Sequence, residues 1–163
     1  MVTRGDAQQV VLPFRHPPMI KVKTRRKGVG CMSDKLKMAR QFIQALPHSM
    51  ALGMELQELG DGSAEITMPY DDKLVGDPKT GVISALMDTC CGAAVMSHPS
   101  NPSATATMDL RIEYLRAATP GQTITTRATC YHVTRSVAFV RATATDDDAE
   151  NLVATATGTF TVE

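Results

Sequence analysis

The chain has 163 residues, enough for one domain with a substantial hydrophobic core. It contains no run of about 20 apolar residues, which argues against a membrane-spanning helix. It also contains no tryptophan and only 4% aromatic residues, which argues against a surface that stacks nucleic-acid bases. We therefore expect neither a membrane nor a nucleic acid as its partner.

The net charge of zero conceals an uneven distribution of charge. Residues 1–31 contain seven of the seventeen lysines and arginines but one of the seventeen acids, so residues 32–163 are mildly acidic. We interpret residues 1–31 as a basic, mobile extension, or as translation from a start upstream of a functional Met32. An arm for nucleic acid or anionic membranes and a transit peptide are the alternatives. Residues 32–163 are expected to form the single domain.

The first part of this domain is predicted to contain a helix and a hairpin. Apolar residues fall on one helical stripe from Ser33 to Leu46, and Pro47 is expected to end that helix. Alternating apolar residues that begin at Leu52 and Ala64 predict two strands, joined by a turn at residues 60–62.

An apolar segment from Val82 to Met96 follows a loop rich in turn-forming residues. The segment has helical length, and Asp88 is its only charged residue. A helix that is apolar on all sides is buried on all sides, and a carboxylate within it is costly unless it is partnered or protonated. We therefore identify Asp88 as the centre of the chemistry; a structural carboxylate bonded to Ser84, Thr89 or a strand hydroxyl is the alternative.

Four more strands are predicted after this helix. In the clearest one Ala106, Met108, Leu110, Ile112 and Tyr114 alternate with polar residues that include Thr105 and Thr107. The other three are expected at residues 124–133, with a bulge near Tyr131, at 136–145 and at 152–162. Six strands and one apolar helix indicate an α+β fold, in which an antiparallel sheet curls around the helix. The exposed edges of such a sheet favour pairing with a second copy.

Five stretches of this sequence, in the same order, resemble the hotdog-fold acyl-CoA thioesterases of the PaaI-like group. The resemblance extends over residues 35–162 and is carried by residues 74–81, 85–89, 109–116, 134–136 and 152–160. It implies a hotdog fold, with a six-stranded antiparallel sheet wrapped around a long central helix. It also implies hydrolysis of an acyl-CoA to a free acid and coenzyme A, in a homodimer, often paired into a homotetramer, whose sites lie at the subunit interface.

The resemblance assigns Asp88 as general base or nucleophile, and backbone N–H groups at the helix start as the donors that polarise the thioester carbonyl. The residues themselves agree, because Gly81, Ser84 and Asp88 recur on one helical face, and Gly81 and Val82 carry N–H groups at the positive end of the helix dipole. Ser84 is a candidate substrate contact, or a serine that bonds to a carbonyl one turn earlier.

Further substrate contacts are predicted on two strands. Thr105 and Thr107 lie on the polar face of a strand that can reach a partner's site, or they are simply strand formers. Arg135 and Ser136 occupy a position that the family often uses for the phosphates and pantetheine of coenzyme A, and a guanidinium suits phosphate geometry.

The His-Gly-Gly sequence that the family usually carries at the helix entrance is absent. Counting back from Asp88 places Lys79, Thr80 and Gly81 there. Alternatively, these residues belong to the preceding loop and a few residues have been deleted. The departure supports a second function, a non-catalytic hotdog dimer that binds acyl-CoA or another apolar ligand.

The four cysteines have no CxxC spacing, and we interpret them as small apolar residues in a reducing compartment, which predicts a cytoplasmic protein. The histidines and cysteines show no metal-ligand spacing. We therefore expect no metal and no cofactor apart from coenzyme A as part of the substrate.

Overall fold

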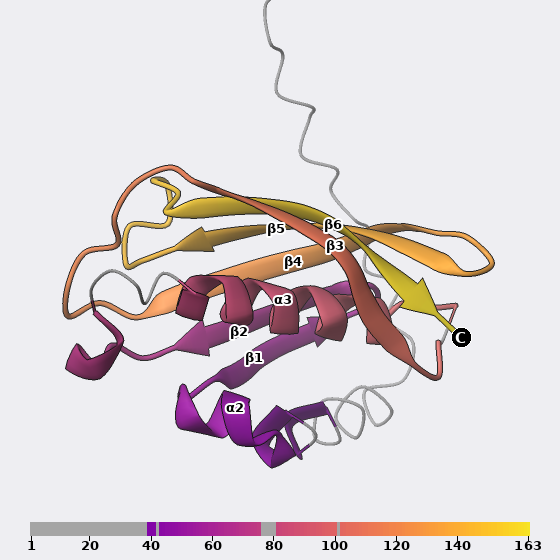
Figure 1. Ribbon diagram of the computed structural model, residues 1–163, viewed down its shortest axis with the longest axis horizontal. Helices are drawn as coiled ribbons and strands as arrows, with labels where there is room; N and C mark the ends of the chain where they lie inside the picture. Colours follow the sequence, from indigo (N-terminus) through magenta and orange to yellow (C-terminus); the bar gives the residue numbers. More distant parts are fainter. Residues whose placement is uncertain (1–38, 42, 76–80, 101) are drawn as a thin grey trace, which may run out of the picture.

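Six antiparallel strands form one sheet that curls around a long helix (Figure 1). The computed structural model describes residues 39–41, 43–75, 81–100 and 102–163, so the predicted N-terminal extension at residues 1–31 lies outside them. The sheet order is β1-β2-β4-β5-β6-β3. The strands are β1 (Glu55–Gly60), β2 (Ser63–Met68), β3 (Thr105–Tyr114), β4 (Ile124–Val133), β5 (Val137–Thr145) and β6 (Ala154–Val162), and the long helix is α3 (Gly81–Met96). The predicted α+β architecture is confirmed.

The segment before β1 contains one helix more than the sequence predicts. Residues 39–41 and 43–45 are helical, and this helix ends before Pro47 as predicted, but Pro47 also begins a second short helix that was not predicted, α2 (Pro47–Ala51). Leu46, the residue before the proline, is extended with φ −79° and ψ 117°. The proline ring excludes the helical conformation at the preceding residue and suits the first position of a helix, so it breaks the chain into two helices.

Strand β1 forms one edge of the sheet, and Arg40 lies against it. The Nε of Arg40 donates to the Leu56 carbonyl at 2.8 Å, and its Nη2 donates to the Gln57 carbonyl at 3.2 Å. Two carbonyl groups of an edge strand are thus occupied within the chain. Strand β3 forms the opposite edge (Figure 1).

Small side chains on the inner face of the sheet allow α3 to lie close to it. The buried strand residues include Ala64, Ala128, Ala138, Ala142, Ala144, Ala154 and Ala156. The thiol of Cys90 on α3 lies 3.4 Å from both the Ala64 and the Thr126 carbonyl oxygens, so the helix approaches the backbone of β2 and β4 directly. Larger residues on the strands would hold the helix away, because protein interiors have no spare volume.

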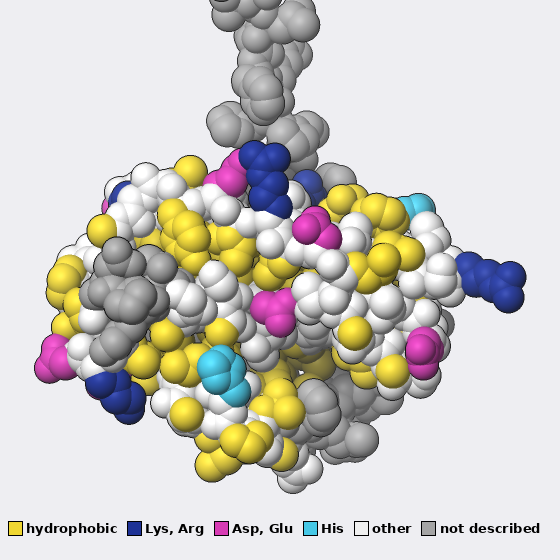
Figure 2. Space-filling view, viewed as in Figure 1, with side chains coloured by type: hydrophobic (Ala, Val, Ile, Leu, Met, Phe, Trp, Pro, Cys, Tyr) yellow, Lys and Arg dark blue, Asp and Glu magenta, His cyan; other side chains and the backbone are white. Residues whose placement is uncertain are grey.

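Helix α3 is buried on one side only, which corrects the expectation of burial all round. Its buried residues are Leu86, Met87, Cys90, Cys91, Ala94 and Val95. The residues on the other side, which include Val82, Ala85, Asp88, Thr89 and Gly92, are half-buried. Figure 2 shows the molecule in the same view, and the surface over α3 combines apolar side chains with polar groups and an acidic side chain. No helix within the described ranges is long and apolar enough to cross a membrane.

A bulge in β3 changes which side chains face the helix. The pairing of β3 with β6 shifts between Thr107 and Asp109, so Thr107 pairs with Phe160 while Leu110 pairs with Gly158. Phe160 and Gly158 are both buried on the inner face. Thr105 and Thr107 therefore share the inner face with Leu110, Ile112 and Tyr114. The predicted placement of the two threonines on the polar face was wrong, because simple alternation does not anticipate an extra residue at Met108.

Gly158 is the residue of β6 that accommodates this bulge. A Cβ built on Gly158 would collide with the Asp109 carbonyl oxygen and lie 2.9 Å from the Leu110 Cδ1 and 3.2 Å from its Cα. The nearest of these is a backbone atom, which cannot move without disturbing the pairing of the two strands.

We expect Gly158→Ala to lower the free energy of unfolding by about 1–3 kcal/mol, as overpacking in a close-packed core usually does. Urea denaturation measures this change. Gly92→Ala in α3 is the matched control, because the nearest atom to its Cβ, outside the helix's own nearby backbone, is 3.8 Å away on Phe160, an ordinary contact. The control should be neutral or stabilising, since alanine is favoured over glycine in helices. Equal stability of Gly158→Ala and wild type would contradict the role given to Gly158.

Candidate active site

Asp88 and Thr107 meet on the half-buried side of α3. The hydroxyl of Thr107 donates a hydrogen bond of 2.7 Å to the Oδ1 of Asp88. Asp88 is half-buried rather than enclosed, so one carboxylate oxygen is held by a strand hydroxyl while the group remains within reach of solvent. The structure therefore brings together two of the predicted site residues through the bulge in β3.

A second polar contact lies one helical turn before Asp88. The Ser84 Oγ and the Tyr114 Oη are 2.6 Å apart, and either oxygen can be the donor. Four residues of helix correspond to a rise of about 6 Å, so this hydroxyl pair is the next polar group along the same side of α3. Sequence reasoning assigned no role to Tyr114. The available signal was a tyrosine at the end of an otherwise apolar strand face, where its hydroxyl needs a partner.

Helix α3 begins at Gly81, so Gly81 and Val82 carry backbone N–H groups in its first turn; that these groups bind a carbonyl stays a prediction. The first four N–H groups of a helix have no partner within it. Among the described residues, apart from its chain neighbours and the nearby backbone of the helix itself, no atom lies within 4 Å of a Cβ built on Gly81. Seven residues separate Gly81 from Asp88, a rise of about 10 Å along the axis. One carbonyl group therefore cannot contact the helix start and Asp88 of the same chain together.

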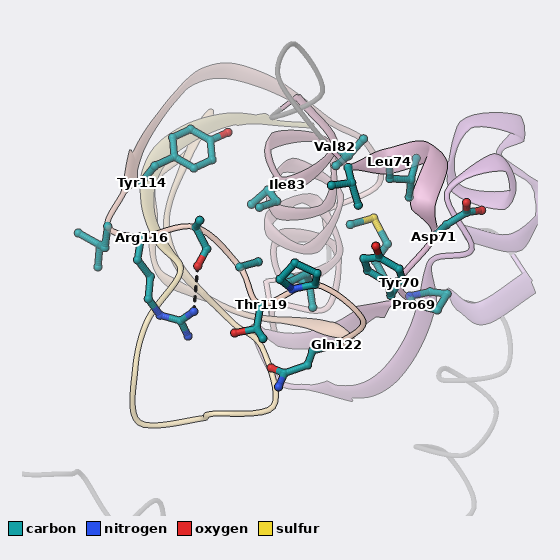
Figure 3. Close-up of a pocket in the computed structure, with 17 residues that line it drawn as sticks. Pro69, Tyr70, Asp71, Leu74, Val82, Ile83, Tyr114, Arg116, Thr119 and Gln122 are labelled. Atoms are coloured by element: carbon teal, nitrogen blue, oxygen red, sulfur yellow. Dashed lines mark hydrogen bonds between the residues drawn. The ribbon is translucent and has the colours of Figure 1, made fainter.

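An apolar pocket of about 570 Å³ opens beside the first turn of α3 (Figure 3). It lies between that turn, the segment after β2 and the segment that joins β3 to β4. Its walls include a short 3₁₀ helix, η1 (Asp72–Leu74), at Leu74. Tyr114 also lines it, and Figure 3 shows Tyr114 and Leu74 on different sides of Ile83. The remaining apolar walls are Met68, Pro69, Val75, Val82, Leu115, Ala117, Ala118, Pro120 and Ile124. Its volume lies within the usual range for sites that bind small molecules.

An ion pair fixes the wall of this pocket that follows β3. Arg116 donates from Nη1 and Nη2 to the two carboxylate oxygens of Asp146, at 2.7 Å each. Asp146 also accepts from the backbone N–H of Thr119 at 3.0 Å. The Arg116 guanidinium is the main reason that the pKa of Asp146 lies well below its usual range. A bidentate pair of this kind restricts the segment geometrically as well as electrostatically.

The other predicted contacts lie elsewhere in the chain. The hydroxyl of Thr105 donates to the Thr161 carbonyl at 2.7 Å, which gives it a structural partner on β6. Arg135 and Ser136 are exposed in the turn between β4 and β5. Within the described part of the chain, no hydrogen bond or ion pair joins either of them to Asp88. Their proposed contact with coenzyme A stays a prediction.

The described cysteines are free thiols and are buried. Burial raises the pKa of Cys91 to about 12 and raises those of Cys90 and Cys130 as well, so these thiols are poor nucleophiles. Across the described residues, no group of three or more histidine, cysteine or acidic side chains is arranged to hold a metal ion. That no metal takes part stays a prediction.

Comparisons with known proteins give the same architecture. The sequence profile of the thioesterase superfamily matches residues 80–153. A solved protein from Pseudomonas aeruginosa is 32% identical, with a TM-score of 0.71 over 79% of this chain and 99% of its own. A thioesterase family protein from Silicibacter pomeroyi is 25% identical, with a TM-score of 0.66 over 78% of this chain and 96% of its own.

A more distant structure shares the fold alone. The E. coli PaaI protein from the phenylacetic acid degradation operon is 20% identical, with a TM-score of 0.72 over 81% of this chain and 96% of its own. No protein with a curated description matches the sequence.

The Arg116–Asp146 ion pair predicts that the free energy of unfolding falls as the pH is lowered into the acid range. A carboxyl group whose pKa is lowered by folding stabilises the folded state above its unfolded pKa, near 3.9, and that stabilisation is lost as the pH falls towards the folded pKa. Asp146→Asn should therefore lower the urea midpoint at pH 7 and lose less stability than wild type between pH 5 and pH 3. Glu65→Gln, which disrupts the more exposed Glu65–Arg127 pair, is the control and should change the midpoint little. Parallel pH profiles for wild type and Asp146→Asn would contradict this role.

Proposed function

Because the chain belongs to the thioesterase superfamily and has its hotdog fold, we propose that it is an acyl-CoA thioesterase, which hydrolyses an acyl-CoA to a free acid and coenzyme A. The observation that carries the proposal is the carboxylate of Asp88, held by Thr107 on the accessible side of α3. A positioned carboxylate with a free lone pair can remove a proton from water or attack a carbonyl carbon directly.

Thr107 orients Asp88 in this proposal. Its hydroxyl donates to Oδ1, which leaves Oδ2 for the attacking water. The bond also keeps the side chain in one rotamer, so the carboxylate points towards the same place in every turnover. Thr107 acts through Asp88 and is a positioning residue.

The apolar pocket is the proposed place for the acyl group. Its walls are mainly aliphatic, and it lies beside the first turn of α3, on the N-terminal side of Asp88. An acyl chain bound in this pocket would place its thioester near the middle of α3 and its coenzyme A group outside the pocket. Arg135 and Ser136 are the proposed contacts for the phosphates and pantetheine of coenzyme A. Thr105 is a further proposed substrate contact.

A second copy of the chain completes the site. The N–H groups of Gly81 and Val82 lie about 10 Å along the helix from Asp88 of the same chain, so the donors nearest to that carboxylate must come from another α3 or from side chains. Strand β3 forms an edge of the sheet, whereas the opposite edge is occupied by Arg40. Pairing through β3 is therefore our proposal for the homodimer. Association of two dimers into a homotetramer stays an expectation from the family resemblance.

A second function, binding without catalysis, is favoured by one observation. The His-Gly-Gly entrance of the family is missing, while this chain has an apolar pocket. Such a protein would hold an acyl-CoA or another apolar ligand without hydrolysing it.

Release of free thiol from acetyl-, hexanoyl-, phenylacetyl- and palmitoyl-CoA tests the two functions. We expect turnover by wild type and a loss of at least about 100-fold in kcat for Asp88→Asn, because the base is removed and its shape is kept. Thr107→Val should lower kcat less, about 10-fold, since the carboxylate loses only its orientation. Asp109→Asn is the matched control and should leave kcat unchanged, because Asp109 lies on the outer face of β3.

Absence of thiol release from every acyl-CoA would reject the thioesterase. If acyl-CoA then still raises the melting temperature of the protein, the function is binding without catalysis. Equal turnover by wild type and Asp88→Asn would instead reject the catalytic role of Asp88.

Pairing through β3 predicts a specific effect on oligomeric state. Met108 at the bulge is 60% exposed in the single chain, and pairing through β3 would cover it. Met108→Glu should weaken the dimer by at least about 10-fold in dissociation constant, as expected when a charge is buried unpaired. Met50→Glu is the control, because Met50 is 65% exposed on α2 and lies away from β3. Analytical ultracentrifugation measures both; a monomeric wild type, or equal dimer stability of the two variants, would reject this interface.

A further inference from the structure

We propose that the apolar pocket is selective for uncharged acyl groups, and that the Arg116–Asp146 ion pair sets this selectivity by neutralising the one cation of the described pocket wall. The inference rests on the proposed thioesterase function and names its substrate class: a thioester of an aliphatic or aryl acid that carries no second carboxylate. Its basis is that Arg116 lines the pocket, whereas its partner Asp146 is buried and does not.

The terminal nitrogens of Arg116 have no hydrogen-bond donor left for a ligand, since each carries two N–H groups. Nη1 donates to Asp146 at 2.7 Å and to the Ala117 carbonyl at 3.0 Å, and Figure 3 draws the second of these bonds as a dashed line. Nη2 donates to Asp146 and to the Asn151 carbonyl, at 2.7 Å each. The Nε atom has no partner among the described residues, but it is shielded from solvent, so a ligand in the pocket cannot reach it.

The charge of Arg116 is neutralised together with its donors. The side chain of Asp146 is 1% exposed and that of Arg116 is 24% exposed, so the pair lies mostly away from bulk water. Opposite charges in direct contact largely cancel each other's field at the distance of a ligand. A carboxylate in the pocket would therefore meet neither a free N–H group of Arg116 nor a net positive charge.

Asp71 is the second charged residue of the described wall, and it is also paired. It accepts from the Lys73 backbone N–H at 3.0 Å and forms an ion pair with the Lys73 Nζ at 2.6 Å. Beside it, the Tyr70 hydroxyl is bonded to Asp72 at 2.7 Å. A carboxylate that entered the pocket would lose its water without a replacement, which is costly. An aliphatic chain gains about fourfold in affinity for each methylene group that it buries.

Glutaryl-CoA and 5-methylhexanoyl-CoA test the inference, because a carboxylate in the first takes the place of an isopropyl group of the same shape in the second. Binding is measured by isothermal titration calorimetry with Asp88→Asn, which should not hydrolyse them, and kcat/KM is measured with wild type. We expect 5-methylhexanoyl-CoA to bind at least about 100-fold more tightly than glutaryl-CoA, with a similar ratio of kcat/KM.

Asp146→Asn, added to Asp88→Asn for the binding measurement, tests the ion pair. It removes the anion and keeps its shape, so Arg116 is left with a net positive charge. We expect the preference for 5-methylhexanoyl-CoA to fall at least about 10-fold, because a guanidinium that is no longer neutralised can bind the glutaryl carboxylate. Glu65→Gln is the matched control and should leave the preference unchanged, because neither member of the Glu65–Arg127 pair lines the pocket.

Ala117→Lys keeps the test decisive if Asp146→Asn does not fold. Ala117 lies in the same wall and is exposed, so a lysine there adds a cation without removing either member of the ion pair. We expect this variant to reduce the preference at least about 10-fold as well. Ala117→Met adds a side chain of similar length without a charge, and it should not reduce the preference.

Equal affinity of the two thioesters for Asp88→Asn, or no binding of either, would overturn the inference. An unchanged preference in folded Asp146→Asn, or in Ala117→Lys, would overturn the role of the wall charge. Thiol release by wild type from both thioesters at equal rates would reject the selectivity and leave the thioesterase standing. No thiol release, with selective binding of 5-methylhexanoyl-CoA, would reject the thioesterase and leave the selectivity of the pocket standing.

Discussion

The bulge in β3 determines the arrangement of the site. Thr107 and Tyr114 are seven residues apart, and in a regular strand they would point to opposite faces of the sheet. The shift in pairing between Thr107 and Asp109 adds one residue, so both side chains reach α3, one at Asp88 and the other at Ser84. Gly158 on β6 makes the shift possible, because any Cβ there would meet the Asp109 carbonyl. The polar contacts of the site thus depend on a glycine that touches none of them.

The small residues of the core also help to position the site. Alanines on the inner face of the sheet let α3 approach the strands closely, and the helix fills the remaining volume with Leu86 and Met87. Close packing fixes the axis and rotation of the helix. The accessible side of α3 is thereby held in one orientation relative to β3. Rigid elements position reactive groups more accurately than loops do, which suits a carboxylate that must meet one carbon atom.

Periodicity in the sequence predicted the strands, the long helix and the bulge near Tyr131, where the alternation visibly breaks. It did not predict the bulge at Met108, because Ala106, Met108 and Leu110 continue an apolar alternation without interruption. The bulge brings the Asp109 carbonyl against Gly158 of β6, a long-range contact that local patterns do not contain. Asp88 was identifiable as the one charge in an apolar helix. The contact between Ser84 and Tyr114 was not, because periodicity gives the face on which each residue lies but not which helix residue lies opposite which strand residue.

The distance between the start of α3 and Asp88 limits the catalysis that a single chain can perform. The helix start and Asp88 are too far apart to act on one carbonyl, so a site that relied on backbone donors alone would need both helices of a dimer in exact register. In the proposed dimer, the second copy would also cover the half-buried side of α3 and exclude water from it, which strengthens the polar contacts of Asp88.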